Sequence, residues 1–198
     1  MRVVITENIT LDGVVDAGAG WFAPAADDPV DESDIEAELR RHMARQDGLL
    51  LGRVTFEEFR GYWPAQTDDR TGITDHLDRV PKYVVSSTLD DPAWEGTTVL
   101  RGPLVDEVRA LREAPGGDLG ITGSISVAHR LIDAGLVDEY RLLVYPVVIG
   151  TGRRLFAEGT DRRDLRLERA MTFRSGITLL VYVTPDPPRT AATAPGGP

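Results

Sequence analysis

The sequence of 198 residues contains no cysteine, which excludes disulfide bonds, thiol catalysis, iron–sulfur clusters and Cys-ligated zinc. It also contains no apolar run near the ~18–20 residues that span a bilayer. The start of the chain, Arg2-Val3-Val4-Ile5 followed by Glu7, is strand-like and is not typical of a signal peptide. We therefore predict a protein of the reducing cytoplasm.

Basic residues are scarce relative to acidic ones. The chain has 22 Lys and Arg against 32 Asp and Glu, a net charge of −10. A surface of this sign is unsuited to neutralising many phosphates, so broad binding to nucleic acid or to an anionic membrane is disfavoured. A locally basic pocket on such a chain would favour a small anionic ligand.

Familiar catalytic motifs are missing as well. No pair of the three histidines has the spacing of metal ligands, and H-E-x-x-H, G-x-S-x-G and G-x-x-x-x-G-K-[ST] do not occur. We predict no metal site. The carboxylates considered for proton donation are Asp12, after the first predicted strand, and Asp34, Glu36 and Glu38, on the first predicted helix. A turn former and a charged helix face are the alternative explanations.

What is present is the pattern of one α/β domain. Short apolar runs at residues 2–5, 49–51, 83–85, 99–100 and 119–122 are typical of buried strands, and helical spacing of apolar residues follows most of them. Ser33, three residues before Glu36, has the spacing of a capping box and predicts a helix that ends near Gly48. This alternation predicts a mostly parallel sheet with flanking helices and right-handed crossovers.

The last third of the chain has a different pattern. Residues 140–149, 165–173 and 177–183 are β-prone, and Ser175-Gly176 separates the last two runs as a hairpin turn would. Antiparallel strands are therefore expected to complete the sheet. Residues 185–198 are rich in Pro, Ala and Gly and have little to bury, so we predict a disordered tail after a domain of residues 1–184.

Three strand-to-helix or strand-to-loop junctions carry groups suited to phosphate. In open α/β sheets, ligands bind beyond the carboxyl ends of the strands, and the junctions hold a Gly52-Arg53-Val54-Thr55 segment, a Ser86-Ser87 pair and a Gly123-Ser124-Ile125-Ser126 segment. Each one alone is also explained by turn formation, helix capping or solvation. Together they favour a phosphorylated nucleotide, with Arg53, Arg101 and Arg153-Arg154 as the arginines best placed to face it.

The third junction does not have the G-x-G-x-x-G fingerprint, so an ordinary Rossmann domain is not predicted. Two aromatic clusters, Trp21-Phe22 and Tyr62-Trp63, flank the first predicted helix. They are equally compatible with the walls of a site for a planar heterocycle and with a satellite core.

The ordered set of motifs resembles the dihydrofolate reductase-like superfamily, specifically stand-alone proteins similar to the C-terminal reductase domain of the bifunctional riboflavin-biosynthesis deaminase-reductase. The resemblance covers residues 1 to about 184 and rests on five segments. These are Ile9-Thr10-Leu11-Asp12-Gly13, Leu49-Leu50-Leu51-Gly52-Arg53-Val54-Thr55, Lys82-Tyr83-Val84-Val85-Ser86, Gly135-Leu136-Val137-Asp138-Glu139 and residues 146–156. It implies a three-layer α/β fold with a mixed, mostly parallel sheet and antiparallel C-terminal strands.

The resemblance also implies an NADPH-dependent reductase that transfers hydride to a small heterocycle, such as the ribosylamino-pyrimidine of riboflavin biosynthesis, and a homodimer. By matching motif, Gly52, Arg53 and Thr55 would meet the NADPH 2′-phosphate and diphosphate, and the hydroxyls of Ser86 and Ser87 would add donors for the 2′-phosphate. Arg101 is added to this set only because it follows a predicted strand. Backbone amides of Gly123, Ser124, Ile125 and Ser126 would face the diphosphate, and Asn8 and Val15 would hold the nicotinamide carboxamide. Glu36 matches the helix acid by spacing. A non-catalytic NADPH-binding sensor is the alternative, and a ligand-free dimerisation module is a third hypothesis.

Overall fold

The computed structural model describes residues 1–16, 20–22 and 31–185. Beyond Pro185, the tail that we predicted to be disordered lies outside the described residues. The strands are β1 (Arg2–Thr10), β2 (Gln46–Gly52), β3 (Lys82–Val85), β4 (Thr97–Leu100), β5 (Asp118–Ile121), β6 (Glu139–Tyr145), β7 (Arg166–Thr172) and β8 (Thr178–Val183). The helices are α1 (Ser33–Met43), α2 (Arg53–Tyr62), α3 (Ile73–Arg79), α4 (Leu104–Glu113) and α5 (Ile125–Asp133), with a short 3₁₀ turn, η2 (Trp63–Ala65).

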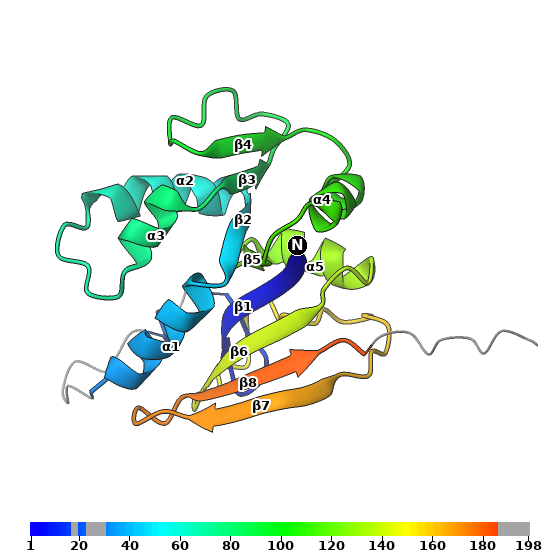
Figure 1. Cartoon of the computed structure of the whole chain (residues 1–198). Coiled ribbons are helices and arrows are strands. Elements are labelled where there is room, and N and C mark those ends of the chain that lie inside the picture. Colours follow the sequence, from blue (N-terminus) through cyan, green and yellow to red (C-terminus); the bar gives the residue numbers. More distant parts are fainter. Residues whose placement is uncertain (17–19, 23–30, 186–198) are drawn as a thin grey trace, which may run out of the picture.

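The eight strands form one mixed sheet in the order β4-β3-β2-β5-β1-β6-β8-β7 (Figure 1). The first six in this order are parallel, and β8 pairs antiparallel with both β6 and β7. The predicted mostly parallel sheet with antiparallel C-terminal strands is confirmed. The order also inserts β5 between β2 and β1, so the chain reverses its direction of winding at the centre of the sheet.

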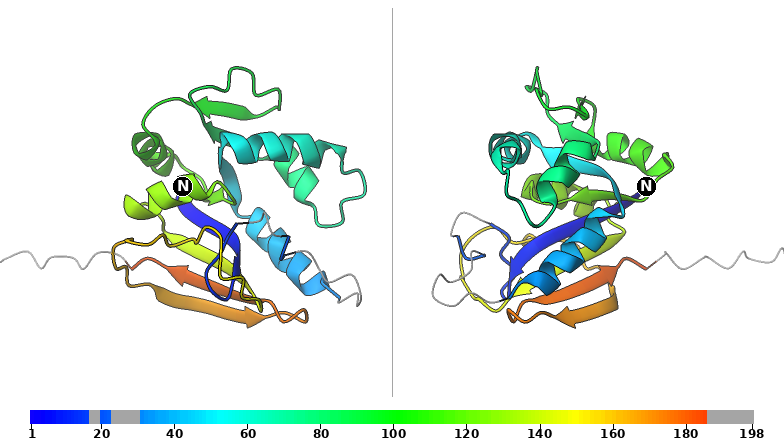
Figure 2. Two further views of the ribbon diagram at one scale, coloured as in Figure 1. Left: turned by 180° about the vertical axis from the view of Figure 1, so that it is seen from behind. Right: turned by 60° about the vertical axis from the view of Figure 1, so that its left-hand side comes forward.

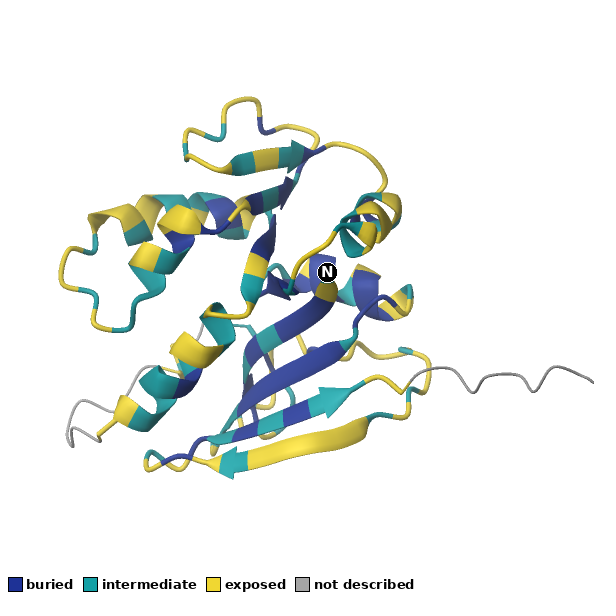
Figure 3. Ribbon diagram, in the orientation of Figure 1, coloured by how far each residue is buried: buried dark blue, intermediate teal, exposed yellow. Residues whose placement is uncertain are grey.

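Helices cover both faces of the sheet, which gives three layers (Figure 2). Alternate residues of a strand point to opposite faces, and β2 illustrates this. Leu50 belongs to the core shared with α4 and α5, whereas Leu49 and Leu51 pack with α2 and α3. The helix α1 covers the same face as α2 and α3 but at the other end of the sheet, where Ile35 packs against the core of β6 and β8. The central strands are buried and β7 is mainly exposed (Figure 3).

The first helix begins at Ser33, as predicted, but its predicted capping bond and its predicted end are wrong. Ser33 makes no capping bond, and its hydroxyl instead accepts a hydrogen bond from the Arg174 guanidinium (2.9 Å), which comes from the β7–β8 hairpin. The helix ends at Met43 rather than near Gly48. Residues from Gln46 onward join the sheet, because β5 offers a partner strand there and Gln46 pairs in register with Asp118.

Two other boundaries differ from the predictions. The strand expected over residues 140–149 ends at Tyr145, since Pro146 has no N–H to continue the ladder. The helix α3 was not predicted. The hairpin between β7 and β8 is confirmed, and Gly176 adopts a φ of 83° in its turn, a conformation that glycine reaches without steric cost.

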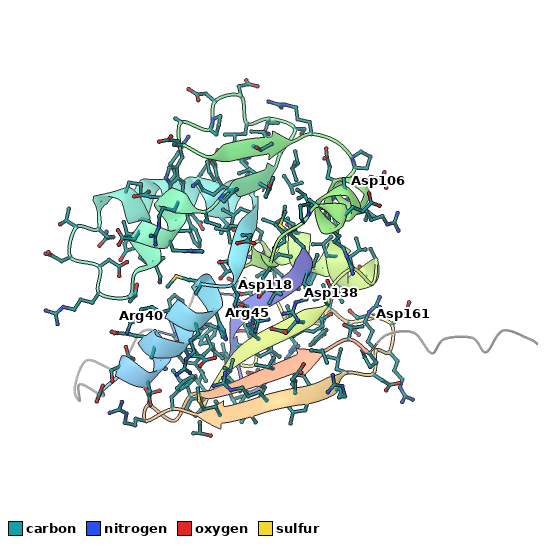
Figure 4. The ribbon with its side chains drawn as sticks, viewed as in Figure 1. Arg40, Arg45, Asp106, Asp118, Asp138 and Asp161 are labelled. Atoms are coloured by element: carbon teal, nitrogen blue, oxygen red, sulfur yellow. The ribbon has the colours of Figure 1, made fainter. Side chains whose placement is uncertain are left out.

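A buried ionic network lies at the amino-terminal ends of β1, β5 and β6. Arg141 bonds to Asp118 and Glu139 at 2.6 Å each, and all three side chains are less than a tenth exposed. Arg2 bridges the same two carboxylates. Arg45 Nε lies 3.7 Å from Asp118 Oδ2, and Figure 4 labels these two residues next to each other. The network joins three strands at the sheet end where these strands begin. Within the described part of the chain, no helix has the length and apolarity needed to traverse a bilayer.

Candidate active site

A cavity of about 1090 Å³ opens over the carboxyl-terminal halves of the central strands. Its walls come from α1 on one side and from α2, η2 and α3 on the other, and it reaches the start of α5. The reversal of winding between β1, β5 and β2 creates this opening, because the helices that follow β1 and β2 diverge there. Ligand crevices of open α/β sheets form at such switch points.

The junctions after β2 and β5 meet at one end of this cavity. The Gly52 amide donates to the Ser124 hydroxyl oxygen (2.6 Å), and that hydroxyl donates to Thr55 Oγ1 (2.9 Å). Gly52, Arg53 and Thr55 line the cavity together with Gly123, Ser124, Ile125 and Ser126. Two predicted segments separated by about 70 residues are therefore side by side.

The backbone at the second junction is left-handed at two consecutive residues. Gly123 has a φ of 69° and Ser124 a φ of 61°. A Cβ added to Gly123 would lie 3.1 Å from Thr55 Cγ2, so both conformation and space favour glycine there. The turn points the start of α5 toward the cavity. The first N–H groups of any helix have no acceptor within the helix itself.

Positive charge at this end comes from Arg53 and Arg130, which both line the cavity. Arg53 Nη1 is 2.7 Å from Glu57 Oε2 one turn along α2 and remains 44% exposed. A surface pair of this kind is weak, so the guanidinium is available to an anion. Asn8 and Val15, predicted to hold a carboxamide, line the same cavity near the end of β1.

Three other predicted cofactor residues are not among its lining residues: Ser86, Ser87 and Arg101. The Ser86 hydroxyl accepts hydrogen bonds from the amides of Thr88 and Leu89, which makes it a turn former. Arg101 donates to the carbonyl oxygens of Ser87 (3.3 Å) and Leu89 (2.7 Å). Val85, the residue before Ser86, does line the cavity.

The predicted carboxylates Asp12 and Glu36 are likewise not among the lining residues. The Asp12 carboxylate accepts hydrogen bonds from the Thr10 hydroxyl and the amides of Ile149 and Gly150. These hydrogen bonds lower the pKa of Asp12 to about 2, and the bond from Thr10 has the largest effect. Glu36 lies 3.7 Å from Arg40 on α1.

Glu7 is an acid in the cavity lining that the sequence analysis did not select. It is 7% exposed, and its Oε1 accepts a hydrogen bond from the Gly123 amide at 2.9 Å. Burial raises the pKa of Glu7 to about 8, and the Gly123 bond only partly opposes this shift. At neutral pH the group is thus an uncharged acid. The sequence contained a signal for Glu7, because an acid stands on the face of β1 that otherwise carries the buried residues Val3, Ile5 and Ile9.

Two histidines line the cavity from opposite walls. Burial, followed by the charge of Arg141, lowers the pKa of His42 on α1 to about 4. Burial also lowers the pKa of His76 on α3, whose Nε2 lies 2.7 Å from Gln46 Oε1. Both rings are uncharged at neutral pH and add no positive charge to the cavity.

Aromatic side chains line the rest of the cavity. Trp21 meets Tyr145 edge to face at a centroid distance of 5.2 Å and Phe22 at 5.7 Å, and Phe59 and Trp63 form a second pair across the opening. Trp63 also packs against the core of α2 and α3. It is therefore both a wall of the cavity and part of a satellite core, the two roles considered for the aromatic clusters. Tyr62 is 56% exposed and does not line the cavity.

The arrangement combines an anion-suited end with a planar, apolar end. The Gly52 and Gly123 amides already donate to Ser124 and Glu7, so the groups suited to a diphosphate are the amides of the first turns of α2 and α5 and two arginines. Aromatic walls suit a flat ring. Among residues 1–16, 20–22 and 31–185, no group of three or more His, Asp or Glu side chains is disposed to hold a metal ion.

Comparisons with known proteins agree with this architecture. The model of the family described as RibD C-terminal domain matches residues 2–179. The uncharacterized protein YyaP of Bacillus subtilis (strain 168) is 30% identical over 183 residues, which cover 91% of this chain and 94% of the relative.

Solved structures show the same fold at lower identity. A pyrimidine reductase-like protein from Corynebacterium diphtheriae is 16% identical with a TM-score of 0.64, over 94% of this chain and 92% of the other. A dihydrofolate reductase from Enterococcus faecalis complexed with NADP(H) is 18% identical with a TM-score of 0.60, over 93% and 97%. The expected dihydrofolate reductase-like fold is confirmed.

Proposed function

The chain belongs to the RibD C-terminal domain family, and from this premise we propose that it is an NADPH-dependent reductase acting on a small planar heterocycle. The observation that supports the proposal most is the meeting of the β2–α2 and β5–α5 junctions at one end of a single cavity. Structural relatives described as reductases, one of them complexed with NADP(H), favour the same chemistry.

Bound NADPH would supply the hydride, and the chain would bind and orient it. The starts of α2 and α5 would face the diphosphate with their amide groups. Arg53 would pair with the 2′-phosphate, and Ser87 and Arg101, which are not among the lining residues, would extend this contact only if the cofactor reaches past Val85. Asn8 and Val15 would hold the nicotinamide carboxamide.

Glu7 contributes through its protonation state. A carboxylate next to the Gly123 turn would repel a diphosphate, whereas an uncharged acid does not. The raised pKa of Glu7 keeps the group neutral at physiological pH. Its carboxyl O–H is then also a hydrogen-bond donor inside the cavity.

The proposal is tested by comparing NADPH with NADH, which lacks the 2′-phosphate. Arg53→Ala should weaken NADPH binding by about 10- to 100-fold, the range expected for loss of a charged hydrogen bond, and leave NADH binding nearly unchanged. Arg109→Ala, which removes an exposed arginine of α4, is the matched control and should change neither. Equal affinity of the wild-type protein for both cofactors would contradict the assignment of Arg53.

A second candidate function is a non-catalytic NADPH-binding sensor. It is favoured by the position of the predicted proton donors, Asp12 and Glu36, outside the cavity lining. Oxidation of NADPH distinguishes the two functions. Steady turnover with any member of a panel of pterins, pyrimidines and related carbonyl compounds supports the reductase, and tight NADPH binding without turnover supports the sensor.

A further inference from the structure

The turn that follows β1 is joined to the segment that follows β6 through one carboxylate. Asp12 accepts a hydrogen bond from the Ile149 amide on Oδ1 (3.3 Å) and another from the Gly150 amide on Oδ2 (2.8 Å). The Thr10 hydroxyl donates to Oδ1 at 2.7 Å, and it accepts a hydrogen bond from the Val14 amide at 2.9 Å. Hydrogen bonds to an ionised acceptor are stronger than those between neutral groups. The carboxylate therefore ties together two segments that lie 137 residues apart.

Backbone contacts continue this junction toward the cavity. Val14 and Arg154 form an isolated antiparallel bridge, and the Val15 amide donates to the Arg153 carbonyl oxygen at 2.9 Å. A Cβ added to Gly152 would lie 2.8 Å from Val14 Cγ1, so no side chain fits between the two segments at this point. The position of Val15 thus depends on the segment that follows β6.

The residues placed in this way belong to the lining of the cavity. Val15 and Asp16 are lining residues, whereas Asp12 is not. The Asp16 carbonyl oxygen accepts a hydrogen bond from Trp21 Nε1 (2.8 Å), and the Trp21 ring meets Tyr145 edge to face. The junction therefore supports both a residue expected at the nicotinamide carboxamide and one of the aromatic walls.

We propose that Asp12 is a positioning residue, which holds the turn after β1 so that Val15 and Trp21 lie correctly at the nicotinamide end of the cavity. The inference rests on the proposed function, which assigns Val15 to the carboxamide. It replaces the role of proton donor that the sequence suggested for Asp12. The carboxylate oxygens are engaged by three donors outside the cavity lining, so the group acts on the site through the backbone that it holds.

A fragment of the cofactor separates this role from a general loss of structure. 2′-Phospho-ADP-ribose carries both phosphate groups of NADPH but lacks the nicotinamide ring. In the full-length protein, Asp12→Ala should weaken NADPH binding by at least about tenfold and leave binding of the fragment within about twofold of the wild type. Isothermal titration calorimetry measures both affinities. An equal loss for the two ligands, or no loss for either, overturns the proposal.

Two milder variants keep the proposal testable if Asp12→Ala does not fold. Asp12→Asn retains one acceptor oxygen, so its selective loss of NADPH affinity should lie between those of the wild type and Asp12→Ala. Thr10→Val removes the hydroxyl that joins Asp12 to Val14, and it should also weaken binding of NADPH more than binding of the fragment. If neither variant shows this selectivity, the proposal fails.

Asp106→Ala is the matched control. It removes an exposed carboxylate that lies 3.6 Å from Arg109 on α4, and it should change neither affinity. A selective loss of NADPH affinity in this variant as well would show that the effect does not come from the junction, and would overturn the proposal.

Failure of this inference can be distinguished from failure of the proposed function by measuring the wild type first. If the wild type binds neither NADPH nor the fragment, the proposed function is wrong and this inference falls with it. If the wild type binds both ligands but the Asp12 variants lose both equally, only the role of Asp12 is wrong. If NADPH binds no more tightly than the fragment, the nicotinamide end contributes no affinity for Asp12 to organise, and the inference is again overturned.

Discussion

Glu7 is the residue whose environment differs most from what its position in the sequence predicts. It lies on the buried face of β1 and contacts the Gly123 turn, 116 residues later in the chain. Alternation along the strand favours an apolar residue at that position. A carboxyl group there costs stability when it is charged, and this is the physical origin of its raised pKa.

The free energy of unfolding should therefore depend on pH through Glu7. In the folded protein Glu7 has a pKa of about 8, whereas in the unfolded chain it releases its proton near the ordinary pKa of a glutamate, 4.5. Between these values the folded state binds more protons, so stability falls as pH rises, by up to about 1.4 kcal/mol per pH unit from this group. Below about pH 4.5 its full contribution is present, and above about pH 8 no further loss is expected.

Urea unfolding of the wild type and of Glu7→Gln across this pH range measures the effect. The Gln amide oxygen can still accept the Gly123 hydrogen bond but does not titrate. The wild type should lose stability relative to the variant as pH rises. Parallel pH profiles would show that Glu7 does not keep its proton in the folded state.

Which residues line the cavity was predictable where their position depends on local chain geometry. Gly52, Arg53 and Gly123 follow strands and precede helices, and this position in the sequence was sufficient to select them. Ser86 and Asp12 were selected on the same grounds. Their oxygens instead accept hydrogen bonds from nearby turns, and the sequence does not reveal that competition.

At the scale of elements, apolar periodicity predicted which segments are strands and helices, but partners from distant segments decided where they end. The Ser33 hydroxyl binds Arg174 of the β7–β8 hairpin and does not cap α1. Pairing with β5 draws Gln46 and Asp47 into a strand. Both effects arise from tertiary contacts across more than 70 residues, and a local pattern contains no information about them.

The contact between the β2–α2 and β5–α5 junctions gives a prediction at this scale. Ser124→Ala removes the acceptor of the Gly52 amide and the donor to Thr55. Loss of such bonds at a partly buried site should lower the free energy of unfolding by about 1–3 kcal/mol. Because the Ser124 hydroxyl holds the two junctions together, NADPH binding should weaken as well.

Ser126→Ala is the control for this substitution. Ser126 is exposed in the first turn of α5, and alanine favours the helix, so its free energy of unfolding should remain within about 0.5 kcal/mol of the wild type. Chemical denaturation of the three proteins makes the comparison. If Ser124→Ala is as stable as Ser126→Ala, the junction does not depend on the hydroxyl bridge.

For the whole molecule, strand order was the part that the sequence left open. Apolar and β-prone runs indicated the strands and the antiparallel end of the sheet, and the family resemblance implied the fold. No local pattern places β5 between β2 and β1. That insertion brings the Gly52 and Gly123 junctions together and separates the cores on the two sides of the cavity, one shared by α2 and α3 and one by α1.

A ligand that fills the cavity would connect these two cores and should stabilise the whole domain. A ligand that binds only the folded state adds RT ln(1 + [L]/Kd) to the free energy of unfolding, about 2.7 kcal/mol when NADPH is present at about 100 times its Kd. For a chain of this size that energy corresponds to a rise in Tm of roughly 5–10 °C. NADH at the same concentration should produce a much smaller rise, and Arg53→Ala should bring the two rises close together, because only NADPH has the phosphate that Arg53 would bind. A thermal scan at several cofactor concentrations measures all of these effects. A Tm that is insensitive to NADPH would favour the ligand-free dimerisation module, since that hypothesis alone gives the cavity no ligand that could join its two sides.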